Sequence, residues 1–79
     1  MYMKDKELDK IMGSILKELR IKNGFTMQQI SNRLGFKNRS SIADYESGRL
    51  SISIYNLKRM CDIYNTDYKE VLSRIFRMM

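Results

Sequence analysis

Residues 26–46 contain two short segments of helical character on either side of a glycine, and this arrangement restricts the possible folds more than any other feature. Thr26 and Gln29 match the capping box, in which each side chain satisfies a backbone N–H of the other residue, so a helix is expected to begin here. Gly35 ends that helix after roughly two turns, because glycine adopts the left-handed conformation past a helix end without strain. The apolar residues of this helix share one face: Met27, Ile30 and Leu34.

The second helix of this stretch is expected to begin at Asn38 or at Ser40, since both residue types favour the N-cap position. Ile42 and Tyr45, three residues apart along the sequence, are its inward-facing residues. Gly48 ends it for the same reason that Gly35 ends the first helix. The stretch therefore predicts two short helices joined by a tight turn.

Three further amphipathic segments flank this pair. From Leu8 the apolar residues recur at every third or fourth position, which predicts a helix that ends near Gly24. Ser53 can cap a fourth helix, and Asp67 a fifth. Residues 1–7 mix charged residues and methionine without a clear period, so a flexible N-terminal arm is expected there. The chain is thus predicted to be all-α, with five helices.

A chain of 79 residues supports one domain, and residues 1–79 are expected to form it. The absence of proline and the presence of only four glycines favour a mostly helical fold. The single cysteine, Cys61, lies on an apolar helical stripe and is expected to be buried rather than reactive. With no cysteine pair, no signal peptide and no apolar run of about 20 residues, the chain is expected to be cytoplasmic and to have no membrane partner.

The net charge is +6, and its distribution is more informative than its size. Residues 1–10 and 60–79 each contain equal numbers of basic and acidic residues, so the whole excess lies between them, over the two short helices and their borders. A concentrated basic surface is expected of a protein that binds phosphate groups of nucleic acid. The alternative is a solvated surface that happens to be basic.

Two short helices with glycine in the turn match the helix-turn-helix plan, in which the second helix lies in the DNA major groove. The start of a helix attracts phosphate, because it carries a partial positive charge and free N–H groups. Arg39, at the start of the second helix, can donate two parallel hydrogen bonds to guanine O6 and N7. The alternative for Arg39 is an ordinary solvent-exposed arginine.

The combined pattern resembles the lambda-repressor/Cro-type helix-turn-helix family, also called the XRE family. The matching segments lie between Ile11 and Leu72 and are LKELRIKNGFT, QQISNRLGF, RSSIADYESG and IYNLKRMCDIYNTDYKEVL. The resemblance implies a compact five-helix lambda-repressor-like domain with the helix-turn-helix at helices 2 and 3, and it implies that helix 3 reads DNA.

Transferred position by position, the resemblance assigns base reading to Arg39, Ser40 and Asp44. It assigns contacts with the DNA backbone to six residues around them: Gln28, Lys37, Asn38, Ser41, Ser47 and Arg49. It also pairs Arg20 with Glu46 in a partly buried salt bridge that holds the reading helix at its angle.

Three features depart from the family pattern. The position after the helix 2 cap, often Gln in the family and in contact with phosphate, is Met27 here, and Gln28 is expected to replace it. The turn Phe36–Arg39 is longer than in the shortest family members, so the phasing of Lys37 to Arg39 in the groove stays open. Asp44 is acidic where a base reader is expected, and it either accepts a hydrogen bond from cytosine N4 or repels phosphate and restricts the register.

The last helix carries more apolar residues than one small core should absorb. Val71 and Leu72 are expected to face the core. The other apolar residues of this segment are expected to form a homodimer interface: Tyr68, Ile75, Phe76, Met78 and Met79. A two-fold dimer places two reading helices about 34 Å apart, which is one turn of DNA. The alternative is a C-terminus with exposed methionines.

The expected function is sequence-specific binding of double-stranded DNA by a small transcriptional regulator, a repressor that acts as a homodimer on a palindromic operator. The alternative is a protein-interaction module on the same fold, such as an antitoxin or a coactivator bridge. An enzyme is not expected, because the chain has no histidine and its cysteine has no base partner. No metal, cofactor or small-molecule ligand is expected. A nucleoid-associated protein of bacterial or phage origin fits these expectations.

Overall fold

The computed structural model describes residues 5–78 and contains five helices in this range. They are α1 (Asp5–Lys22), α2 (Met27–Leu34), α3 (Ser40–Ser47), α4 (Ile54–Ile63) and α5 (Tyr68–Met78). Residues 5–78 contain no strand, and none of these helices is long and apolar enough to cross a membrane. The predicted all-α architecture, with the helix-turn-helix at α2 and α3, is confirmed.

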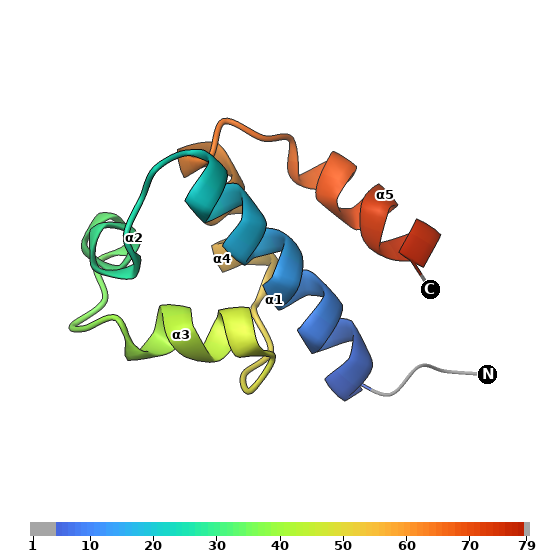
Figure 1. Ribbon diagram of the computed structural model, residues 1–79, viewed down its shortest axis with the longest axis horizontal. Helices are drawn as coiled ribbons and strands as arrows, with labels where there is room; N and C mark the ends of the chain where they lie inside the picture. Colours follow the sequence, from blue (N-terminus) through green and yellow to red (C-terminus); the bar gives the residue numbers. More distant parts are fainter. Residues whose placement is uncertain (1–4, 79) are drawn as a thin grey trace.

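α1 runs through the middle of the molecule, with α2 and α3 on one side and α5 along the other (Figure 1). It packs against both α3 and α5, while α4 packs against α2 and α5 and closes the core. The core is formed by the apolar stripes that the sequence predicts on each helix, and Cys61 is buried within it as expected. Its fully buried large side chains come from all five helices: Leu16, Ile30, Ile42, Leu57, Met60, Tyr64 and Ile75.

The ends of α2 follow the predicted local chemistry. Thr26 Oγ1 accepts a hydrogen bond from the Gln29 N–H at 3.1 Å, and Gln29 Oε1 accepts one from the Thr26 N–H at 2.9 Å. At the other end Gly35 has φ = 79°, and its N–H donates to the Asn32 carbonyl. The Phe36 N–H donates to the Ser31 carbonyl at 3.0 Å, which completes a Schellman motif.

Two helix starts differ from the expectations. α1 begins at Asp5 rather than Leu8, so residues 5–7 of the expected flexible arm are helical, and residues 1–4 lie outside the described range. Acidic residues in a first helical turn interact favourably with the helix dipole, which favours the earlier start. Ser40 is the first residue of α3 and not its cap. Arg39 is the N-cap residue and makes no side-chain capping hydrogen bond. Asn38, one residue earlier, accepts a hydrogen bond at its Oδ1 from the Ser40 N–H at 2.8 Å.

α1 and α3 approach each other most closely at Gly13. A Cβ atom at this position would lie 2.3 Å from the Tyr45 carbonyl oxygen and 2.7 Å from that of Glu46. These are backbone atoms, which cannot move aside as the end of a flexible side chain would. The backbones of the two helices are therefore in direct contact, and only glycine fits between them.

Gly13→Ala is expected to lower the free energy of unfolding by about 1–3 kcal/mol, because the added methyl group pushes α3 away from α1. The higher helix propensity of alanine, worth about 1 kcal/mol, acts in the opposite direction but is the smaller effect. Urea denaturation measures the change, with Ser14→Ala on the exposed face of α1 as the matched control. An alanine variant as stable as the parent would show that the helices are not in contact here.

Candidate nucleic-acid interface

The segment from Lys37 to Ser41, which we call the tip, joins α2 to α3 and begins α3. Lys37, Asn38, Arg39 and Ser40 are exposed, and Ser41 is half-buried. The Arg39 guanidinium forms no ion pair within residues 5–78 and is available to an external partner. The tip lies on the side of the molecule opposite α5 (Figure 1). The structure thus brings together the predicted base readers Arg39 and Ser40 with three of the predicted backbone contacts.

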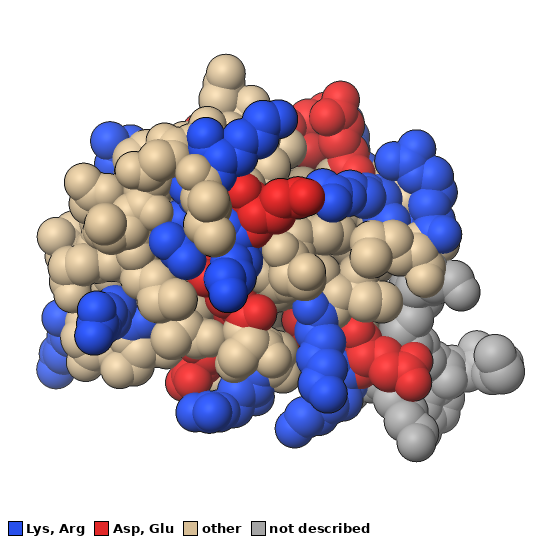
Figure 2. Space-filling model, viewed as in Figure 1, with Lys and Arg blue, Asp and Glu red and all other residues tan. Residues whose placement is uncertain are grey.

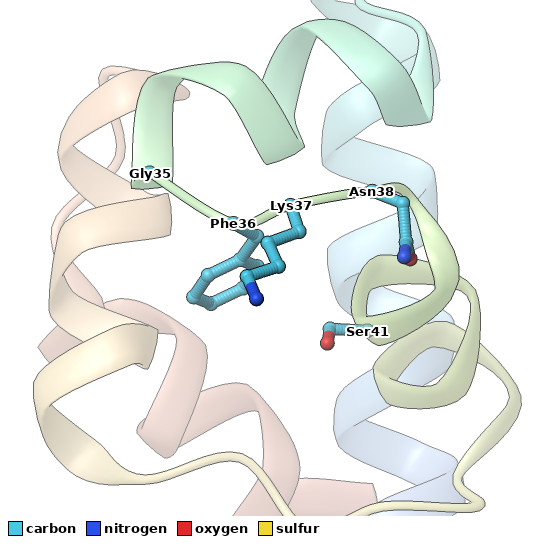
Figure 3. A pocket seen from close by; sticks show the side chains of 5 residues that line it. All are labelled: Gly35, Phe36, Lys37, Asn38 and Ser41. Carbon is cyan, nitrogen blue, oxygen red and sulfur yellow. The ribbon is translucent and has the colours of Figure 1, made fainter.

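The tip contains a shallow pocket of about 380 Å³, lined by Gly35, Phe36, Lys37, Asn38 and Ser41. Figure 3 shows the Lys37 side chain lying beside the Phe36 ring and the Ser41 hydroxyl facing the same space from α3. An ammonium group and a hydroxyl group are both donors of the kind that bind phosphate oxygens. This pocket therefore offers the kind of donors that a contact with the DNA backbone requires.

Two hydrogen bonds fix the conformation of the tip. Ser31 is completely buried in α2, and its Oγ donates to the Asn38 carbonyl at 2.6 Å. Asn38 Oδ1 in turn accepts from the Ser40 N–H. Ser31 therefore ties α2 to the segment immediately before α3.

The other predicted residues of α3 gather at its C-terminal end. Asp44 is half-buried, and its Oδ1 lies 3.4 Å from Nη1 of Arg49, an exposed side chain. The Asp44 carbonyl accepts hydrogen bonds from the Arg49 N–H at 2.9 Å and from Ser47 Oγ at 3.2 Å. Asp44, Ser47 and Arg49 therefore form one cluster, apart from the start of α3. Their assignment to DNA stays a prediction.

Gln28 lies on the exposed side of α2, where its Nε2 donates to Asn32 Oδ1 at 2.9 Å. Met27 is half-buried and packs against the core. At the start of α2, the Met27 side chain therefore points toward the core and the Gln28 side chain points toward solvent. Its contact with the DNA backbone stays a prediction.

Arg20 and Glu46 form a two-pronged ion pair between α1 and the end of α3. Arg20 Nε lies 2.7 Å from Glu46 Oε2, and Arg20 Nη2 lies 3.0 Å from Oε1. Arg20 Nη1 also donates to the Phe25 carbonyl at 2.9 Å, so the guanidinium joins three segments of the chain. The side chains are only 11% and 3% exposed, and hydrogen bonding to Glu46 raises the pKa of Arg20. The guanidinium therefore stays charged, and both of its hydrogen bonds to Glu46 lie out of solvent.

Figure 2 shows basic side chains at the lower left and along the lower edge, and others at the top and the upper right. Acidic side chains lie near the centre, at the lower edge and on the right. The exposed basic residues of the helix-turn-helix and its border are Arg33, Lys37, Arg39 and Arg49. Such a surface attracts a polyanion and steers its approach.

An exposed helix start, held against a second short helix by a glycine turn and bordered by basic residues, defines a helix-turn-helix protein. The helix-turn-helix family model matches residues 16–71 of the chain. The chain therefore belongs to the XRE-type helix-turn-helix family, a family of DNA-binding transcription regulators and not of enzymes.

Solved structures share this fold. The chain is similar to the clp gene regulator ClgR from C. glutamicum, with a TM-score of 0.80 and 21% identity over 91% of this chain and 92% of that chain. It is also similar to the S. venezulae BldD DNA-binding domain, with a TM-score of 0.71 and 20% identity over 82% of this chain and 96% of that chain. Comparison of the sequence with curated proteins found no match.

The predicted interface residues of α5 separate into two groups. Ile75 is 1% exposed and belongs to the core, one helical turn from buried Val71 on the same face. It also lines an apolar groove beside Phe76, and its assignment to a homodimer interface stays a prediction. Tyr68 is half-buried and packs against the core. Phe76 and Met78 are exposed, whereas Met79 lies outside the described residues.

Two residues that contact the helix-turn-helix have no role in the sequence-based prediction. Arg59 of α4 donates to the Leu34 carbonyl at the end of α2, and Asn56 of α4 donates to the Tyr45 hydroxyl in α3. The signal available in the sequence is their spacing, since residues three apart in a helix share a face.

Glu46→Gln is expected to lower the free energy of unfolding by about 3 kcal/mol, because it leaves the Arg20 charge buried without a counter-charge. The matched control is Glu18→Gln, which breaks an exposed pair between Glu18 and Arg74 that also joins α1 to another helix. Because that pair is screened by solvent, the control should leave the urea midpoint almost unchanged. Equal effects of the two substitutions would contradict a special role for the buried pair.

Proposed function

We propose that the chain is a transcriptional repressor that binds double-stranded DNA sequence-specifically as a homodimer on a palindromic operator, in the cytoplasm. The observation that carries this proposal is the conformation of the tip. Its polar and basic side chains are exposed, while two hydrogen bonds, from Ser31 and to Asn38 Oδ1, fix its backbone. A reader of base edges needs both properties, because its donors must be accessible and held in register.

In the proposed complex α3 lies in the major groove with its first turn toward the base edges. Arg39 donates to guanine O6 and N7, and Ser40 contacts the neighbouring base edge. Lys37 and Ser41 bind a phosphate oxygen from the tip pocket, and Asn38 and Gln28 contact the backbone beside it. Ser47 and Arg49 do the same at the far end of α3. Asp44, once it is released from Arg49, either accepts a hydrogen bond from cytosine N4 or disfavours any alignment on the DNA that places a phosphate next to its carboxylate.

Arg39→Ala is expected to flatten the sequence preference, because one bidentate contact with guanine discriminates by about 1–3 kcal/mol. Lys37→Ala is expected instead to weaken binding on all sequences alike and to reduce the slope of log K against log salt by about 1. Selection of duplexes from random DNA, followed by titrations at several salt concentrations, measures both effects. An Arg39 variant that kept the parental site would refute α3 as the reading helix.

The same selection tests the proposed function as a whole. A palindromic site with a fixed half-site spacing supports the repressor, since the spacing reports the distance between two reading helices. Binding without preference among sequences, or no salt-dependent binding, favours the protein-interaction module instead.

The homodimer is supported by an apolar groove of about 430 Å³ between α1, the start of α4 and α5. Leu8, Met12, Ile54 and Leu72 line it, and Phe76 stands at its wall with 67% of its surface exposed. In a two-fold dimer the same patch is used twice, so Phe76 of each copy can enter the groove of the other. The proposed interface also includes Tyr68, Met78 and Met79, the last of which lies outside the described residues.

Phe76→Asp is expected to shift a dimer toward monomer at micromolar concentration, because a carboxylate buried in an apolar groove is strongly unfavourable. Sedimentation velocity with and without the selected duplex measures the change. Ile21→Asp is the matched control, since Ile21 is a similarly exposed apolar residue near the other end of α1. A parent protein that remained monomeric on its operator would remove the homodimer from the proposal.

A further inference from the structure

Arg59 and Asn56 of α4 connect the end of α2 to α3 from behind the helix-turn-helix. We propose that Arg59 is a positioning residue: it fixes the turn after α2 and thereby sets the sequence preference of the tip, without contacting DNA itself. This inference rests on the proposed function.

The argument begins with the carbonyl groups at the end of α2. The last carbonyls of a helix have no partner within it and carry its partial negative charge. The Schellman motif satisfies those of Ser31 and Asn32. The Leu34 carbonyl accepts instead from Arg59 Nη2, at 3.0 Å. A cation from α4 therefore completes the end of α2, immediately before the turn.

Other contacts hold the Arg59 side chain in place. Its Nη1 lies 3.4 Å from Asn56 Oδ1, and its guanidinium carbon lies 5.3 Å from the centre of the Tyr55 ring. The planar guanidinium thus binds a carbonyl and an amide oxygen while lying over an aromatic face. Lysine keeps the charge but offers neither the fork nor the flat stacking surface.

The connection continues from α4 to α3 and returns to the turn. Asn56 Nδ2 lies 3.4 Å from the Tyr45 hydroxyl oxygen, and the centre of the Tyr45 ring lies 6.4 Å from that of Phe36. Phe36 follows Gly35 directly and precedes Lys37, the first residue of the tip. The contacts therefore reach the turn from two directions, through the Leu34 carbonyl before it and through the Phe36 ring within it.

A direct contact of Arg59 with phosphate fits the structure less well. The side chain is half-buried, and two of its nitrogens already donate to protein oxygens. A general contribution to stability would reduce the folded fraction and lower the affinity for every duplex equally. Control of the turn would instead change the ratio of specific to non-specific affinity, and this difference separates the two roles.

The decisive experiment compares Arg59→Lys with Lys58→Arg, a charge-conserving change of the exposed neighbouring residue. Affinity is measured for the duplex selected by the parent protein and for a scrambled duplex of equal length. Arg59→Lys should reduce the specific-to-scrambled ratio about tenfold, while the scrambled affinity and its salt dependence stay within about twofold. Lys58→Arg should leave both affinities unchanged. An unchanged ratio in Arg59→Lys, or an equal loss on both duplexes, would overturn the inference.

Two further measurements keep the test decisive. Tyr45→Phe removes only the hydroxyl that accepts from Asn56, and it should reduce the ratio about threefold, by analogy with the loss of one weak hydrogen bond. Backbone amide NMR spectra without DNA should show shifts at residues 35–40 in Arg59→Lys and none there in Lys58→Arg. If the parent protein prefers no duplex, the proposed function fails. Separately, unshifted signals at residues 35–40 in Arg59→Lys would show that Arg59 does not position the turn.

Discussion

The contact between α1 and α3 is the constraint on which the placement of every proposed DNA-binding residue depends. At Gly13 the two backbones touch, and nearer the end of α1 Arg20 holds the end of α3 through Glu46. Removing each of the two charged groups from water costs several kcal/mol. Paired hydrogen bonds of good geometry offset this cost but add little beyond it. The ion pair therefore fixes the orientation of α3 more than it adds net stability, since both hydrogen bonds form at only one angle of α3 relative to α1.

Helix ends and apolar faces were predictable from the sequence because their causes are local. The capping box at Thr26, the glycine ends and the hydrogen bond from Ser40 to Asn38 all involve residues within a few positions of each other. The partner of each helix face is decided by tertiary packing. Ile75 shares a face with Val71, and it is buried because α1 and α4 cover that face, which the pattern of α5 alone does not specify.

The candidate site also has a part that local sequence predicts and a part that depends on tertiary packing. The composition of the tip was predictable, because a polar and basic helix start after a glycine turn is a local pattern. The support from Arg59 was not predictable, since it depends on how α4 packs against α2. An interior glycine in α1 and the three-residue spacing of Asn56 and Arg59 were the available signals. Neither signal identifies its partner without a structure.

Two ion pairs of contrasting burial border α3, and the contrast suits the proposed function. The Glu46 side chain is only 3% exposed, so a ligand cannot compete for it and its pairing with Arg20 holds α3 against α1. Arg49 is 75% exposed, and its 3.4 Å contact with Asp44 is worth at most about 1 kcal/mol in solvent. A phosphate oxygen can displace that carboxylate at little cost, because charge-assisted contacts of arginine with phosphate are stronger than an exposed pair. In the proposed complex, binding would free Asp44 only where the DNA backbone is in register. The exposed pair would then link phosphate contact to base reading, while the buried pair holds the helix.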